Sequence, residues 1–108
     1  GLDAQPVVAN DPFFGRGGAM LAASQKEQAL KFEIVVPIAT AEELTAVVSC
    51  NYHQDHFGKA FEIKTESGDV AHTACVGFGL ERITLALFRC HGFDTSRWPT
   101  PVRTTLGL

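Results

Sequence analysis

The sequence predicts an α+β fold in which an antiparallel β-sheet has a C-terminal helix packed on it. Three observations support this prediction: several short runs of β-forming residues, turn residues between these runs, and one stretch of helical periodicity near the C-terminus. The length of 108 residues, with 45% hydrophobic and 19% charged residues, is that of one globular domain or part of one.

The N-terminal part predicts one short strand and then an irregular loop within residues 1–25, where glycine and proline are frequent. A second strand is predicted at residues 30–38, because apolar and charged side chains alternate there. Phe32, Ile34 and Val36 then share one face of the strand, and Lys31 and Glu33 share the other.

Three further strands are predicted at residues 45–50, 60–64 and 70–76. Thr40 and Glu43 have the spacing of a capping box, which indicates a turn before the first of them. Residues 51–57 follow as a turn or a short helix. The run from Glu66 to Asp69 is typical turn chemistry, so the last two strands are predicted to pair as an antiparallel hairpin.

The C-terminal part predicts one helix and then an extended surface segment. Gly92 provides the helix stop, and Pro99 and Pro101 lie in a tail without periodicity. The predicted sheet-facing side of the helix consists of Leu80, Ile83, Leu87 and Cys90.

Composition and charge narrow the possible functions. A formal net charge of -3 lacks the basic excess of nucleic-acid-binding proteins, so tRNA is not expected as a direct partner. The sequence has neither a membrane span nor a signal peptide, and its three cysteines do not form a disulfide framework. We therefore expect a cytoplasmic protein. Because the first residue is Gly1 and not Met, we expect a C-terminal portion of a longer chain.

The most informative stretch is residues 71–87, where small residues lead through Gly77 and Gly79 into a helix with Arg82 on its first turn. Such glycines let a ligand approach the backbone, and a guanidinium group can stack on an aromatic base or hold a phosphate. A dinucleotide fingerprint would need glycine in place of Arg82, and Gly58-Lys59 is not followed by Ser or Thr, so neither common phosphate loop is present. The residues alone also allow a simple tight turn with a solvated arginine.

Residues 77–82 resemble motif 3 of class II aminoacyl-tRNA synthetases, whose arginine sandwiches the adenine of ATP. With residues 31–38 and 49–57 they follow the order of the seryl-tRNA synthetase core. The set is most similar to the amino acid:[carrier protein] ligases, relatives of the atypical zinc-dependent seryl-tRNA synthetases. The resemblance implies that this chain is part of a class II synthetase-like catalytic core. The implied ATP-binding residues are Arg82, Gly77, Gly79 and Glu33, and the implied substrate-binding residues are Ser49 and Asn51.

A second cluster, in residues 49–57, combines one thiol with two imidazoles. The spacing Cys-x2-His-x2-His lacks the second ligand pair of a structural zinc site, so the pattern alone favours ordinary core and surface roles. The resemblance implies that Cys50 is one of three zinc ligands, with the other two upstream. Cys75 and Cys90 are predicted to be core residues. His53 and His56 stay unassigned.

The implied reaction activates a small amino acid with ATP and magnesium and transfers it to the phosphopantetheine thiol of a carrier protein. The implied full-length enzyme is a homodimer. Motifs 1 and 2 of the family are absent from these residues, so the chain alone is expected to be inactive. Two alternatives stay open: the core of a class II seryl-type aminoacyl-tRNA synthetase, and a non-catalytic synthetase-like binding module.

Overall fold

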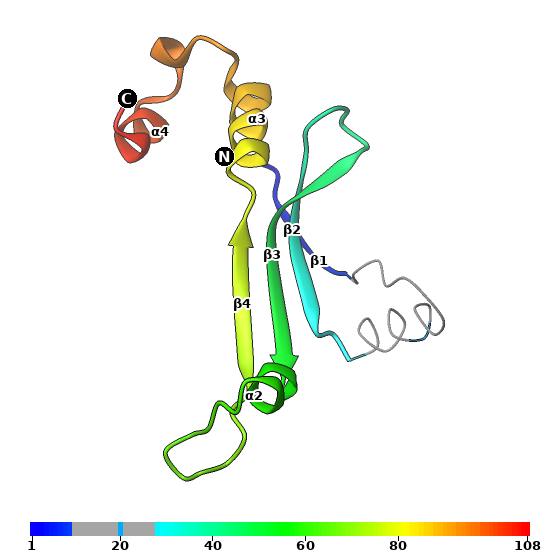
Figure 1. Cartoon of the computed structure of the whole chain (residues 1–108). Helices are drawn as coiled ribbons and strands as arrows, with labels where there is room; N and C mark the ends of the chain where they lie inside the picture. The colour runs from blue at the N-terminus through cyan, green and yellow to red at the C-terminus, as the bar shows by residue number, and fades with distance from the viewer. Residues whose placement is uncertain (10–19, 21–27) are drawn as a thin grey trace.

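The computed structural model describes residues 1–9, 20 and 28–108, and these form a four-stranded antiparallel sheet with helices at its two ends (Figure 1). The strand order is β1-β2-β3-β4. The elements are β1 (Gln5–Val8), β2 (Lys31–Pro37), β3 (Leu44–Gln54), α2 (His56–Ala60), β4 (Thr73–Phe78), α3 (Leu80–His91), the 3₁₀ helix η1 (Thr95–Arg97) and α4 (Thr100–Leu106). The predicted α+β class is confirmed. The loop predicted around Gly15, Gly17 and Gly18 lies outside the described residues.

The strand predicted at residues 45–50 is longer in the structure, because β3 has pairing partners on both sides. Asn51 pairs with Lys31 on β2 and with Cys75 on β4, so the strand continues to Gln54. Of residues 51–57, which the sequence predicts as a turn or a short helix, only His56 and Phe57 are helical, at the start of α2. Glu43 donates its backbone N–H to Thr40 Oγ1 at 3.0 Å, which confirms the predicted turn before β3.

The predicted hairpin of residues 60–64 with residues 70–76 is reduced to one antiparallel bridge, and the predicted strand at residues 60–64 is not formed. Ala60 ends α2, and residues 61–72 form turns joined by one isolated bridge, Lys64 to Val70. The buried Gly58 explains this arrangement. The Ile63 N–H donates to the Gly58 carbonyl, and the Ala71 N–H donates to the Ile63 carbonyl, both at 2.9 Å. The loop thus folds back on α2, and β4 pairs with β3 instead.

Helix α3 begins and ends where the sequence predicts. Gly79 caps it, and Gly92 closes it with φ of 83°, a conformation that glycine adopts without strain. Its predicted contact with the sheet is confirmed at Ile83, which packs against the core, and is wrong at Leu80 and Cys90. Ala86, only 2% exposed, packs with Val36 and Val47 in the core, whereas Leu80 is 69% exposed and Cys90 is also exposed.

The tail after Phe93 is helical, so the prediction of an extended segment is wrong. Trp98 is buried and donates its indole N–H to the Gly92 carbonyl at 2.8 Å, and its ring contacts Phe88. This anchor folds the tail back beside α3. Pro99 is the N-cap of α4 and Pro101 lies in its first turn, where a missing N–H is not costly, so the two prolines start the helix rather than prevent it.

The sheet has two chemically different faces. Cross-strand neighbours point to the same side, and neighbours along a strand point to opposite sides. The apolar face contains the row Phe32–Cys50–Val76, and α3 covers one end of it. The opposite side, here called the polar face, contains two rows, Glu33–Ser49–Gly77 and Lys31–Asn51–Cys75. No described helix has both the length and the apolar character needed to cross a membrane.

Candidate functional site

The polar face has a groove of about 310 Å³ where β2, β3 and β4 approach the start of α3. Its lining consists of Lys31, Glu33, Ala46, Val47, Val48, Ser49, Gly77, Phe78, Gly79 and Arg82. Five residues predicted to bind ATP or substrate therefore come together in one place: Arg82, Gly77, Gly79, Glu33 and Ser49. Glu33 on β2 and Ser49 on β3 are far in sequence from Gly77, Gly79 and Arg82, which lie where β4 leads into α3.

Arg82 is held at one end of the groove. Its Nη1 donates to the Ala46 carbonyl on β3 at 2.9 Å, and the side chain is otherwise exposed. The Gly79 N–H donates to the Val47 carbonyl at 2.8 Å, which ties the start of α3 to the same strand. A guanidinium group carries five N–H donors and two flat faces. One bond to a carbonyl therefore fixes its position and leaves a face for a planar ligand.

The two glycines serve different purposes. A Cβ added to Gly79 would lie 3.4 Å from Arg82 Cδ and 3.5 Å from the Val47 carbonyl oxygen, so this position packs closely against the protein itself. A Cβ added to Gly77 would meet nothing within 4 Å. Packing within the described chain therefore gives no reason for glycine at Gly77. Open space over its Cα is what a ligand lying on the backbone would need.

Glu33 and Lys31 bring opposite charges into the groove. Their side chains lie on the same face of β2, with Lys31 Nζ 3.6 Å from Glu33 Oε1. Lys31 is buried, and its side chain is 10% exposed against 25% for Glu33. Ser49 is the cross-strand neighbour of Glu33, so a hydroxyl group lies beside the ion pair.

Asn51 lies on the polar face next to the groove, within a chain of polar contacts. Its Nδ2 donates to Ser49 Oγ at 3.1 Å and lies 3.6 Å from Cys75 Sγ. The Cys75 thiol is also 3.5 Å from His53 Nε2, and His53 Nδ1 is 3.1 Å from Thr73 Oγ1. Cys75 is exposed, so the prediction that it is a core residue is wrong. Cys90 is likewise exposed.

Cys50 lies on the apolar face, half-buried between its cross-strand neighbours Phe32 and Val76. It therefore points away from Ser49 and Asn51, which flank it in sequence. Within residues 1–9, 20 and 28–108, no three His, Cys, Asp or Glu side chains are close enough to hold a metal ion. The local Cys-x2-His-x2-His arrangement is consequently not formed.

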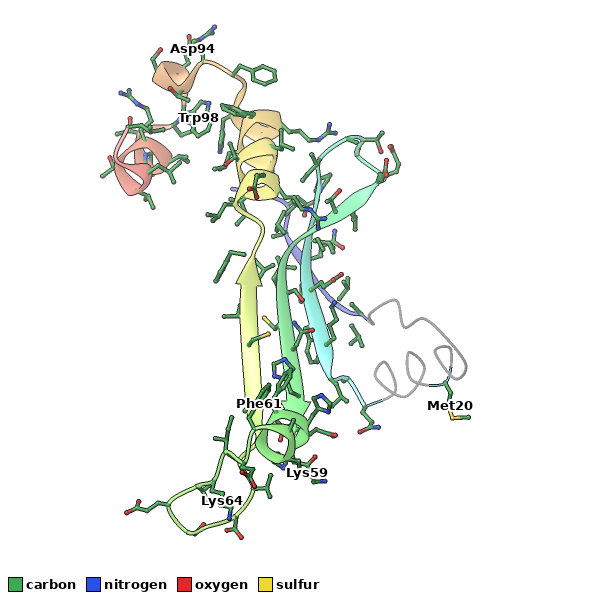
Figure 2. All side chains as sticks on the ribbon, in the orientation of Figure 1. Met20, Lys59, Phe61, Lys64, Asp94 and Trp98 are labelled. Carbon is green, nitrogen blue, oxygen red and sulfur yellow. The ribbon has the colours of Figure 1, made fainter. Side chains whose placement is uncertain are left out.

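The far end of the sheet has its own charged pair on α2. Lys59 Nζ lies 2.7 Å from Asp55 Oδ2, and this hydrogen bond holds the pKa of the Asp55 carboxyl below its usual value of 3.8. Figure 2 shows Lys59, Phe61 and Lys64 grouped at this end, with Trp98 at the opposite end of the molecule. The pair is solvent-exposed and distant from Arg82.

Sequence reasoning gave no binding role to Lys31 and did not place Cys75 or His53 on the polar face. The alternation along β2 already places Lys31 beside Glu33, so that signal was present in the sequence. The positions of Cys75 and His53 depend on the register between β3 and β4, which includes an irregularity between Tyr52 and Gln54. No pattern in the sequence reports that register.

Comparison with known proteins identifies relatives along the whole chain. The chain is 50% identical over 108 residues to amino acid–[acyl-carrier-protein] ligase 1 of Bradyrhizobium diazoefficiens, covering all of this chain and 33% of that protein. It is 54% identical over 100 residues to ligase 2 of the same organism, covering 93% of this chain and 30% of that protein. The chain is homologous to the amino acid–[acyl-carrier-protein] ligases. The suspected family is thereby confirmed.

More distant relatives point to the same superfamily. The type-2 serine–tRNA ligase of Methanopyrus kandleri is 32% identical over 109 residues, covering 94% of this chain and 20% of that protein. No protein-family model matches the chain. The chain spans about one third of the length of the ligases that it matches.

Proposed function

We propose that this chain is part of the catalytic core of an enzyme that activates a small amino acid with ATP and transfers it to a carrier protein. The observation that supports this most directly is the groove, in which the motif residues Arg82, Gly77 and Gly79 meet Glu33 and Ser49. Two relatives that are at least half identical to the chain are named amino acid–[acyl-carrier-protein] ligases, and this supports a carrier protein as the acceptor.

In the proposed first step, a carboxylate oxygen of the amino acid attacks the α-phosphorus of ATP. A new P–O bond forms, and pyrophosphate leaves as the old one breaks. The protein's task is alignment and charge stabilisation, since no protein nucleophile is needed. Arg82 stacks on adenine, and Gly77 leaves space for the nucleotide. The aminoacyl group then passes to the phosphopantetheine thiol, and AMP leaves.

Magnesium is proposed to accompany ATP. A magnesium ion in such sites is held by one or two carboxylates together with substrate phosphates. Glu33 is the one carboxylate in the described groove lining, so it fits as a protein ligand near the phosphates. The Lys31 ammonium at 3.6 Å reduces the local negative charge, so the phosphates would supply most of the attraction.

Zinc is proposed for the full-length protein, where it would supply a Lewis acid for the substrate's amino group. The described residues do not complete such a site, because they include no group of three donors. The resemblance assigns Cys50, whereas the polar face presents Cys75 with His53 Nε2 at 3.5 Å. We therefore propose one thiolate from this chain and treat Cys50 and Cys75 as the two candidates.

The chain's shape supports its being part of a larger domain. Its radius of gyration is 18.3 Å, whereas a compact domain of this length has one of about 13 Å. Within the described sheet, β4 pairs on one side only and its other edge is open. A longer chain would cover this edge, and we propose that the full-length enzyme is a homodimer.

The deciding experiment measures amino-acid-dependent ATP–pyrophosphate exchange by the full-length protein and its Arg82→Ala variant. Loss of a desolvated cation–π contact of about 2 kcal/mol would raise the KM for ATP by about thirtyfold. Arg89→Ala is the matched control, because Arg89 also lies on α3 and donates to main-chain carbonyls, those of Ile38 and Ala39, but lies outside the groove. Unchanged ATP dependence in Arg82→Ala would refute the adenine assignment.

A second candidate function is the charging of tRNA with serine, which is favoured by the name of the Methanopyrus kandleri relative. Both candidates share the activation step and differ in the acceptor. Incubating the full-length protein with ATP, radiolabelled amino acid, and either phosphopantetheinylated carrier protein or total tRNA separates them. Label on tRNA alone would overturn the carrier-protein proposal.

A further inference from the structure

We propose that the Ser49 hydroxyl group donates a hydrogen bond to a non-bridging oxygen of the α-phosphate of ATP, and that Asn51 positions the hydroxyl for this contact. The inference rests on the proposed function and adds a catalytic and a positioning residue to its activation step. The observation that carries it is the direction of the bond between the two side chains. Asn51 Nδ2 donates to Ser49 Oγ at 3.1 Å, so Ser49 is the acceptor in this bond and its own O–H is not used there.

The Ser49 hydroxyl hydrogen is available to a ligand. A serine hydroxyl has one O–H donor and two acceptor lone pairs, and Asn51 occupies one of the lone pairs. Glu33 is the cross-strand neighbour of Ser49, but within the part of the chain that the structure describes no hydrogen bond joins the two side chains. Ser49 is half-buried and lines the groove, so the free donor lies where a bound nucleotide would be.

The strand on the other side of Ser49 leaves room for an anionic oxygen. Ser49 pairs with Gly77 on β4, and glycine contributes no side chain to this row of the polar face. A Cβ built at Gly77 would meet no heavy atom within 4 Å. The space beside the hydroxyl group is therefore open, and a phosphate oxygen can come within hydrogen-bonding distance of it.

The position of Ser49 along β3 matches the α-phosphate rather than the base. Arg82, which is assigned to adenine, donates to the Ala46 carbonyl. Ser49 lies three residues further along the strand, which corresponds to about 10 Å. The ribose separates adenine from the α-phosphate, so that phosphate must also lie some distance from Arg82. Glu33, the proposed magnesium ligand, is opposite Ser49, so the donor and the metal ligand face the same group.

A donor at this position would contribute to catalysis by charge stabilisation. As the carboxylate oxygen forms its bond to the α-phosphorus and the bond to pyrophosphate breaks, the non-bridging oxygens stay negatively charged in a more crowded phosphate. A hydrogen-bond donor that is already oriented stabilises them without reorganisation. Ser49 keeps its proton throughout. Asn51 supplies the orientation, and its own amide lies within reach of two acceptors, Ser49 Oγ and Cys75 Sγ at 3.6 Å.

ATP–pyrophosphate exchange by the full-length protein tests the role of the hydroxyl group. Ser49→Ala should lower kcat by about a hundredfold, the effect of removing one such donor, and should raise the KM for ATP by less than about threefold. Ser49→Thr keeps a hydroxyl group and should retain more than about a tenth of the wild-type kcat. Thr45→Val is the matched control, because it also removes a hydroxyl group from β3 but lies outside the groove, and it should leave both constants unchanged.

A double-mutant cycle tests whether Asn51 acts through Ser49. Asn51→Ala should lower kcat by about tenfold when Ser49 is present and by less than about twofold in the Ser49→Ala background, because coupled residues are not additive. An equal loss in both backgrounds would show that Asn51 acts independently of the hydroxyl group, for example through Cys75, and would overturn its positioning role.

ATP analogues with sulfur in place of one non-bridging α-oxygen identify the atom that is contacted. Sulfur is a weak hydrogen-bond acceptor, so the wild type should discriminate against the diastereomer that places sulfur next to Ser49. In Ser49→Ala this discrimination should fall by about tenfold. The same discrimination in both proteins would assign it to another group and would overturn the proposed contact.

The remaining outcomes separate this inference from the proposed function. A wild type that catalyses exchange, together with an unchanged kcat in Ser49→Ala, would refute the role of Ser49 and leave the proposed function standing. A raised KM for ATP with an unchanged kcat would limit Ser49 to ground-state binding and would also overturn the inference. A wild type that catalyses no amino-acid-dependent exchange would refute the proposed function, and the inference with it.

Discussion

Replacing Gly77 with alanine should impair ATP binding without destabilising the protein. An added Cβ meets no heavy atom within 4 Å, and alanine is favoured over glycine in a strand by about 0.5 to 1 kcal/mol, so the folding free energy should stay equal or rise slightly. The same Cβ enters the groove. Overpacking a fitted ligand typically costs about 1 to 3 kcal/mol, which corresponds to an increase in the KM for ATP of about five- to 150-fold.

Gly58→Ala is the opposite control for this prediction. There the added Cβ would lie 2.1 Å from the Ala71 carbonyl oxygen, so α2 or the loop beside it must shift. This variant should lose about 1 to 3 kcal/mol of stability and retain its KM for ATP while folded. Chemical denaturation and pyrophosphate exchange of both full-length variants give the four values needed. An unchanged KM in Gly77→Ala would refute the view that this glycine makes room for a nucleotide.

Three further predictions concern the rest of the molecule. The 108-residue chain alone should associate through the open β4 edge and its apolar face, and Val76→Lys should reduce association in sedimentation velocity; a sharp, concentration-independent monomer transition would contradict this. Metal analysis should find about one zinc per full-length chain and none held stoichiometrically by the fragment, with zinc lost in either Cys50→Ser or Cys75→Ser; retention in both would exclude the proposed thiolate. The Asp55 pKa, measured by NMR, should rise towards 3.8 in Lys59→Met, because the hydrogen bond that lowers it is lost. In the wild type this pair stabilises α2 above pH 3.8, and the stabilisation is lost as the pH falls through the lowered pKa.

The sequence predicted correctly those helices and strands that depend on residues adjacent in the chain. Residues 31–37 alternate and form β2, and Gly79 and Gly92 delimit α3, because a strand period and a helix stop depend on neighbouring residues. The same local reasoning failed at residues 60–64 and in the tail. Gly58 against Ala71 decides the first case and the burial of Trp98 decides the second, and both are contacts between segments that composition does not report.

The sequence by itself determined the class of the fold, the family and the motif residues of the groove. Arg82, Gly77 and Gly79 lie within six positions of one another, so their proximity follows from chain connectivity. Only the tertiary structure decided which side of the sheet each remaining residue occupies. A strand reverses its side chains at every residue, so a register that pairs Ser49 with Gly77 necessarily turns Cys50 to the apolar face and brings Cys75 to the polar one.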